Sequence, residues 1–108
     1  FKGLKNMYFS KNDKKVIKFY CNINEYENEE MLLKWKDGSQ IKAKFDTCFD
    51  DDNGLDVDDK NYEDFTTFAF AAVETKGNPP VFITKDNYFC INYKNFPEEI
   101  FAGGKKIN

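Results

Sequence analysis

The stretch that decides the fold spans residues 31–73 and reads MLLKWKDGSQIKAKFDTCFDDDNGLDVDDKNYEDFTTFAFAAV. In its first segment Met31, Leu33 and Trp35 share one face, while Lys34 and Lys36 share the other. Side chains of a β-strand repeat every two residues, so this alternation predicts a half-buried strand rather than a helix.

A hairpin is predicted where the alternation is interrupted by Asp37 and Gly38. Asp-Gly between two alternating runs is a strong hairpin signal, because glycine adopts a positive φ without steric cost. Beyond the turn, the residues expected to face the core are Ile41, Ala43, Phe45, Thr47 and Phe49, with Lys42 and Lys44 facing outward.

The rest of the chain adds further strand signals. We expect strands at residues 15–22, 65–74, 81–84 and 88–93. The 65–74 segment is apolar on both faces, which is typical of a central strand covered on both sides. Residues 95–100 could form one helical turn, residues 1–14 are a lead-in of short helix or extended chain, and residues 101–108 are expected to be a frayed tail.

These elements predict a mainly β fold: a five- to six-stranded bent sheet or an SH3/Sm-like barrel, with a short terminal helix as an option. At 108 residues, 41% hydrophobic and 18% aromatic, the chain suits one small domain with an aromatic core. The longest apolar run covers residues 68–73, far short of the ~20 residues that span a bilayer, and no signal peptide is apparent.

The cysteines and the missing residue types restrict the chemistry. Cys21, Cys48 and Cys90 are odd in number and widely spaced, which favours buried, reduced thiols in a cytoplasmic protein. The chain has no His and no Arg, so it lacks the commonest general base and metal ligand near neutral pH. Ser10 and Ser39 have no His to activate them, so we expect no enzyme and no cofactor.

Residues 46–64 are strongly acidic. They contain nine Asp and Glu residues against Lys60 alone, a net charge of −8, whereas the other 89 residues carry ten acids and fifteen lysines, a net charge of +5. Exposed carboxylates at this density repel one another and lower the stability of the compact state. A solvated loop is the simplest interpretation of residues 50–64, since most charge runs are solvated.

A metal site is a second interpretation of this loop. If Gly54 is aligned with the invariant glycine of an EF-hand, Phe49 falls at the first ligand position and Lys60 at the last, and both are unsuitable. Only a looser Ca²⁺ or Mg²⁺ contact through Asp50, Asp52 and Asp56 would be left, so no metal site is predicted.

A docking surface for a basic protein is the interpretation we favour. Clustered carboxylates imitate the charge density of a nucleic-acid backbone and attract a cationic cleft over long range. Leu55 and Val57 could add apolar anchors inside the charged rim. The predicted partner-binding residues are Asp50, Asp51, Asp52, Asp56, Asp58, Asp59, Tyr62 and Phe65.

RNA binding and a purely structural role are the alternatives. Lysines 34, 36, 42 and 44 form a basic strip, and the aromatic residues Trp35, Phe45 and Tyr93 could stack on bases. These aromatics alternate onto the inward face, however, and a net charge of −3 does not suit a phosphate binder, so nucleic acid is not the expected partner.

Two resemblances support these interpretations. Residues 33–46, LKWKDGSQIKAKFD, are similar to the first hairpin of Sm-like and SH3-like small barrels, which implies such a barrel. The chain as a whole resembles the small acidic proteins of low-GC bacteria that include immunity proteins of polymorphic toxin systems. That resemblance implies a non-enzymatic protein that neutralises a toxin, and we expect the toxin surface to be basic.

Overall fold

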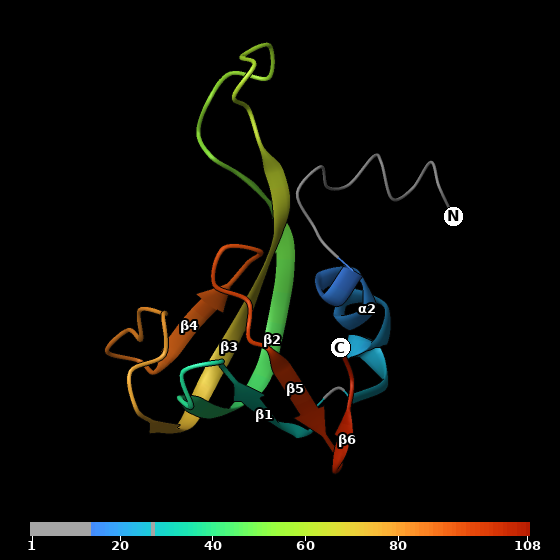
Figure 1. Cartoon of the computed structure of the whole chain (residues 1–108), viewed down its shortest axis with the longest axis vertical. Helices are drawn as coiled ribbons and strands as arrows, with labels where there is room; N and C mark the ends of the chain where they lie inside the picture. Colours follow the sequence, from blue (N-terminus) through green and yellow to red (C-terminus); the bar gives the residue numbers. More distant parts are fainter. Residues whose placement is uncertain (1–13, 27) are drawn as a thin grey trace.

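The computed structural model describes residues 14–26 and 28–108, which form one antiparallel sheet and a short helical segment (Figure 1). The elements are α2 (Lys14–Asn22), the 3-10 turn η1 (Ile23–Tyr26), β1 (Glu30–Lys34), β2 (Gln40–Asp52), β3 (Asp64–Lys76), β4 (Tyr88–Ile91), β5 (Glu99–Ala102) and β6 (Lys105–Lys106). The lead-in expected before residue 14 lies outside the described residues.

The sheet is open. Its strand order is β4-β3-β2-β1-β5-β6, so β4 and β6 lie at opposite edges and do not pair. The mainly β prediction and the six-stranded bent sheet are confirmed, whereas the closed barrel implied by the SH3/Sm-like hairpin is not formed.

The predicted hairpin between β1 and β2 is confirmed. The N–H of Gly38 donates to the carbonyl of Trp35 over 3.0 Å, and the N–H of Trp35 donates to the carbonyl of Ser39 over 3.0 Å. Gly38 has a φ of 91°, a left-handed conformation that a side chain would strain. Asp37 closes the turn by accepting hydrogen bonds from the N–H and hydroxyl of Ser39, which lower the pKa of its carboxyl.

Two irregularities interrupt the long β2–β3 ladder. The register shifts between Lys42 and Ala43 and again between Phe45 and Thr47, where Asp46 is the extra residue. An extra residue exchanges the two faces of the strand beyond it. The prediction that Thr47 and Phe49 face the core is therefore wrong: both are exposed, and Cys48 is half-buried instead.

The strand predicted over residues 15–22 is wrong, because this segment is the helix α2. Val16, Phe19 and Ile23 are buried, at the spacing of three to four residues that brings side chains onto one face of a helix. The β-branched and aromatic content of the segment predicted a strand, but the helical spacing of these three apolar residues allows them to be buried together on one side of a helix. At nine residues α2 is short, and no described helix is long and apolar enough to cross a membrane.

The core lies between α2 and one face of the sheet. Phe19 from α2 contacts Phe68, Phe70 and Phe96, with ring centroids 5.0, 6.1 and 5.8 Å apart. The other buried apolar residues packed in this cluster are Val16, Ile23, Met31, Leu33, Trp35, Ile41, Ala43, Phe89, Ile91, Ile100, Ala102 and Ile107.

The thiols are not all buried as predicted. All three cysteines are free, but Cys21 and Cys90 are exposed and only Cys48 is half-buried. Cys90 points outward because burial alternates along β4, where Phe89 and Ile91 occupy the inward positions.

Two further elements differ from expectation around β4. Residues 81–84 form no strand; instead Thr84 bonds to Tyr88 at the outer edge of β4, its N–H donating to the Tyr88 carbonyl over 2.9 Å. Residues 95–100 form no helical turn, because β5 already begins at Glu99. The strand predicted at 88–93 is confirmed in its first four residues.

The chain end at residues 101–108 is ordered rather than frayed. Ile107 and Asn108 are buried, and the Ile107 N–H donates to the Ile100 carbonyl over 2.9 Å. The Asn108 side chain accepts a hydrogen bond from the Ile100 N–H over 2.9 Å. The prediction of a frayed tail rested partly on the two lysines of β6, which are exposed.

We predict that Phe19→Ala lowers the free energy of unfolding by about 3–5 kcal/mol, because it leaves a cavity at the centre of the aromatic cluster. Urea denaturation measures this loss. Phe82→Ala is the matched control: the Phe82 side chain is 80% exposed, so this variant should change stability by less than about 0.5 kcal/mol. Equal losses in the two variants would contradict the assignment of the core.

Candidate functional site

The acidic stretch forms an arm that projects from the sheet (Figure 1). We call residues 46–64 the acidic arm. Its two strands are the far ends of β2 and β3, which pair without interruption from Thr47 with Ala69 to Asp52 with Asp64. The neighbours stop earlier, since β1 reaches only Lys44 of β2. The predicted loop at residues 50–64 is therefore shorter, and only residues 53–63 lie between the strands.

Three predicted contact residues lie on β2 of the arm, and all are exposed. Alternation along the strand puts Asp50 and Asp52 on one face and Asp51 on the other. Asp51 accepts a hydrogen bond from the Thr67 hydroxyl over 3.0 Å and a second from the Asp52 N–H over 2.9 Å. Asp50 has no such bond within the described chain, so its carboxylate is available.

The loop at the end of the arm is held by its own side chains. The Asn53 N–H donates to the Glu63 carbonyl over 3.2 Å, and the Asn53 amide donates to the Asn61 carbonyl over 2.8 Å. Asp52 accepts from the Gly54 N–H over 2.8 Å, while Asp59 accepts from the Asn61 N–H over 2.8 Å. Such Asx turns give a polar loop a defined shape without a core.

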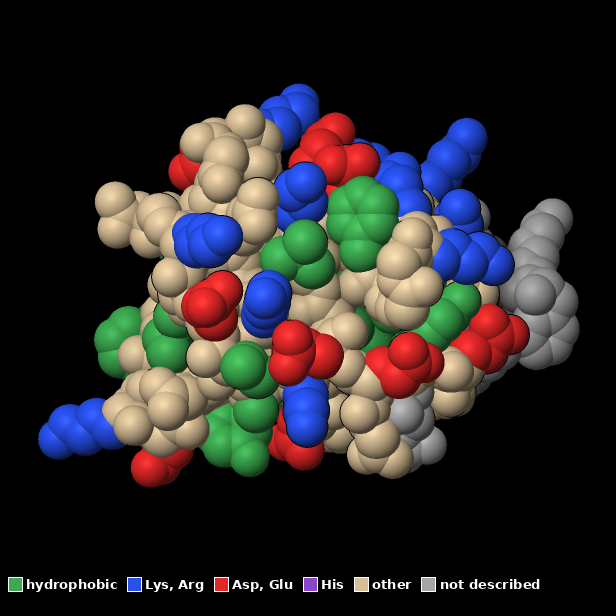
Figure 2. Space-filling view, turned by 90° about the horizontal axis from the view of Figure 1, so that it is seen from below, with side chains coloured by type: hydrophobic (Ala, Val, Ile, Leu, Met, Phe, Trp, Pro, Cys, Tyr) green, Lys and Arg blue, Asp and Glu red, His purple; other side chains and the backbone are tan. Residues whose placement is uncertain are grey.

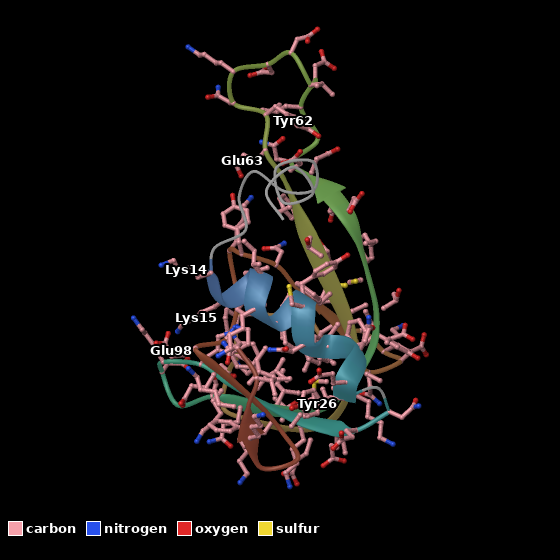
Figure 3. All side chains as sticks on the ribbon, turned by 90° about the vertical axis from the view of Figure 1, so that its right-hand side faces the viewer. Lys14, Lys15, Tyr26, Tyr62, Glu63 and Glu98 are labelled. Atoms are coloured by element: carbon pink, nitrogen blue, oxygen red, sulfur yellow. The ribbon has the colours of Figure 1, made fainter. Side chains whose placement is uncertain are left out.

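The remaining predicted residues lie around the tip. Asp56, Asp58 and Asp59 are exposed, and their carboxylates form no ion pair with any described lysine. Two apolar side chains accompany them, with Val57 77% exposed and Leu55 41% exposed. Figure 3 shows the side chains of this loop directed outward, away from the sheet.

The base of the loop is fixed by a contact between segments far apart in sequence. The Tyr93 hydroxyl donates a hydrogen bond to Oε1 of Glu63. This hydrogen bond, followed by partial burial, raises the pKa of Tyr93. Tyr62 and Glu63 are half-buried at this level of the arm (Figure 3). The pair is separated by thirty residues, and no local pattern in the sequence predicted it.

Phe65, one of the predicted contact residues, is only 4% exposed. Its ring packs edge-on against Tyr93 with centroids 5.4 Å apart, and Nζ of Lys94 lies 6.0 Å from its ring centroid. Phe65 thus contributes to the packing beneath the loop, while Leu55 and Val57 supply the exposed apolar surface.

The carboxylates of the arm create a negative field that reaches neighbouring groups. Burial and then the charges of Asp52 and Asp64 raise the pKa of Tyr62. Burial and then Asp50 raise the pKa of the Cys48 thiol. A thiol with a raised pKa is protonated at neutral pH and is a poor nucleophile.

Charges elsewhere on the described surface are more evenly mixed. Lys15 pairs with Glu98 at 3.0 Å, and Lys42 pairs with Glu74 at 3.8 Å. Figure 2 shows the end opposite the arm, where lysines, acids and apolar side chains are interspersed. At the tip of the arm, by contrast, Asp56, Asp58 and Asp59 form no ion pair with a lysine of the described residues.

The described residues do not assemble a metal centre. No group of three or more Cys, Asp or Glu side chains among them converges in a way that could hold a metal ion. Ser39 is buried in the hairpin turn, where its hydroxyl is bonded to Asp37 at 2.6 Å.

Of the three aromatic residues considered for RNA binding, Trp35 lies in the interior, whereas Phe45 and Tyr93 are half-buried. Trp35 is 8% exposed, and its indole N–H donates to the Asn95 carbonyl over 2.8 Å. Of the strip's lysines, Lys34 lies 5.6 Å from the Phe101 ring centroid and Lys42 is paired with Glu74. Trp35 is therefore engaged in packing rather than presented for base stacking.

Fold and site together define a small open-sheet protein that carries an acidic hairpin arm. Over residues 14–107 the chain matches the family described as "Cognate immunity protein YxxD", and it belongs to this family. Such a protein neutralises a toxin partner, so the immunity-type resemblance seen in the sequence is confirmed. No curated protein and no solved structure gives a significant match.

We predict that Tyr93→Phe lowers the free energy of unfolding by about 1 kcal/mol at neutral pH, because the Glu63 carboxylate loses its hydrogen bond. The pKa of Tyr93 is raised above 10.0, so this stabilisation is present below pH 10 and lost as the pH rises through the pKa of the folded state. Urea denaturation from pH 7 to 11 measures both effects.

Tyr88→Phe is the control for this prediction, since the Tyr88 hydroxyl bonds to no described residue and its side chain is 44% exposed. A Tyr93→Phe variant as stable as Tyr88→Phe at pH 7 would show that the hydrogen bond does not brace the arm.

Proposed function

We propose that the protein neutralises its toxin by docking the acidic arm onto a basic surface of the toxin. Membership of the immunity-protein family implies that the partner is a toxin protein. The acidic arm offers a negatively charged surface, which is complementary to the basic surface that we infer for the toxin. Binding alone is sufficient for this role, because a protein that covers an active cleft need not perform chemistry.

One observation carries the proposal: several carboxylates of the arm are exposed and form no ion pair within the described part of the chain. Asp56, Asp58 and Asp59 form no ion pair with a described lysine, although the described chain outside residues 46–64 carries twelve lysines. A solvated loop needs no such concentration of like charge, whereas a docking surface gains from it. Uncompensated charge steers a cationic partner from beyond contact distance and raises the association rate.

Apolar groups within the charged surface supply short-range affinity. Val57 and Leu55 are exposed at the tip and Tyr62 is half-buried at the base of the loop. Apolar and aromatic anchors inside a polar rim contribute much of the free energy of typical interfaces. Phe65 supports this surface from below through its contact with Tyr93.

The thiols favour action in a reducing compartment. Cys21 and Cys90 are free and exposed, a state that an oxidising environment would not preserve. We therefore infer that the protein meets its toxin in the cytoplasm.

We predict that the triple variant Asp56→Asn, Asp58→Asn, Asp59→Asn raises the Kd for the cognate toxin domain roughly ten- to a hundredfold at low salt, because it removes three interfacial charges of about 0.5–1 kcal/mol each. Calorimetric titration or surface plasmon resonance measures the change. Asparagine keeps the size and turn preference of aspartate, so the loop should retain its shape.

The matched control neutralises three acids away from the arm, Glu25→Gln, Glu30→Gln and Asp86→Asn, all exposed. This variant has the same net charge and should bind within about threefold of the parent protein. If both triple variants weaken binding equally, overall charge rather than the arm mediates docking, and the proposal fails.

A further inference from the structure

The acidic arm has an open strand edge. Beyond Lys44, where the pairing with β1 ends, β2 has a described neighbour only on its β3 side. The other side of β2 therefore runs from Phe45 to Asp52 without a strand beside it in the described chain. In Figure 3 no other ribbon accompanies the upper part of β2 on its right-hand side.

The register determines which backbone groups face this open side. Because the Asn53 N–H donates to the Glu63 carbonyl, these two residues form a hydrogen-bonded pair of the antiparallel ladder. Hydrogen-bonded and non-hydrogen-bonded pairs alternate, so Asp51 and Phe49 direct their backbone groups toward β3. The N–H and C=O groups of Cys48 and Asp50 point away from β3, toward the open side.

The outer strands of the sheet are protected differently. At β4 the Tyr88 N–H donates to Oγ1 of Thr84 over 3.1 Å, and the Cys90 carbonyl accepts from the Asn95 amide over 3.4 Å. At the opposite edge, β6 is only two residues long and both are lysines. Short, lysine-bearing or covered edges are ordinary protection against strand pairing. Among the residues that the structure describes, no strand covers the β2 edge from Phe45 to Asp52, and this segment contains no lysine.

The charge of the edge selects what can pair with it. Asp46, Asp50 and Asp52 are all exposed along this part of β2. A second copy of the chain would bring these carboxylates opposite each other, and like charges across strands destabilise pairing. A strand that carries lysine or arginine would instead place opposite charges across the new ladder.

We propose that a lysine- or arginine-bearing extended segment of the toxin adds to the open edge of β2 as a further strand, bonded to the backbone of Cys48 and Asp50. This inference rests on the proposed function and specifies how the toxin is held. Tip charges accelerate the encounter, and backbone hydrogen bonds along the edge then slow dissociation.

Hydrogen exchange tests the proposal directly in the complex of this protein with the cognate toxin domain, co-expressed and purified together. The amides of Cys48 and Asp50 should exchange rapidly in the free protein and at least tenfold more slowly in the complex. The amides of Phe49 and Asp51 already bond to β3 and serve as internal references. Protection confined to residues 55–60, with Cys48 and Asp50 unchanged, would overturn the proposal while leaving tip docking intact.

A pair of substitutions at one position provides the second test. Asp50→Asn removes the charge and keeps the N–H, whereas Asp50→Pro also removes the outward N–H; proline is tolerated at an edge position of this kind. We expect Asp50→Pro to raise the Kd roughly tenfold more than Asp50→Asn does. Equal affinities of the two folded variants would contradict strand addition. If instead the tip variant fails to weaken binding, the proposed function itself fails.

Discussion

The pairing of β2 with β3 is the constraint on which the rest of the structure depends. Each of these strands has thirteen residues, whereas β1 has five and β4 four. The sheet can therefore enclose only the near half of the hairpin, and the far half projects as a two-stranded ribbon. Such a ribbon is marginal on its own. Its stability derives from the buried half below, from the ring of Tyr93 against Phe65, and from the hydrogen bond of Tyr93 to Glu63.

The residues that stabilise the core therefore differ from the exposed acidic residues that we propose to bind the toxin. Phe19 and the aromatic residues around it stabilise the sheet, and Cys48 is the residue of the acidic arm that packs against this core. The arm carries carboxylates that repel one another, and part of that repulsion is offset locally, because Asp51, Asp52 and Asp59 accept hydrogen bonds from nearby N–H groups. The carboxylates of Asp56 and Asp58 have no such hydrogen bond among the described residues, and we propose that they face the toxin. The arrangement concentrates charge where the loss of stability is least harmful to the core.

Much of this could be predicted from the sequence wherever local patterns dominate. The alternation around Asp37 and Gly38 predicted the first hairpin, and the density of aspartates predicted an exposed acidic element. Features that depend on contacts between distant parts of the chain could not be predicted from the sequence. The extra residue at Asp46 reversed the faces of Thr47 and Phe49, and tertiary packing of Val16 and Phe19 overrode the β propensity of α2. The Tyr93–Glu63 contact that braces the arm depends on a fold that no spacing in the chain specifies.

The central claim is that a field of uncompensated carboxylates on the arm brings the toxin to this protein. The most direct measurement is the association rate constant with the cognate toxin domain as a function of ionic strength, from about 10 to 500 mM. Our account predicts a steep fall, on the order of a hundredfold or more, because salt screens attraction between exposed charges. A rate constant that changes by less than about twofold over this range would contradict it.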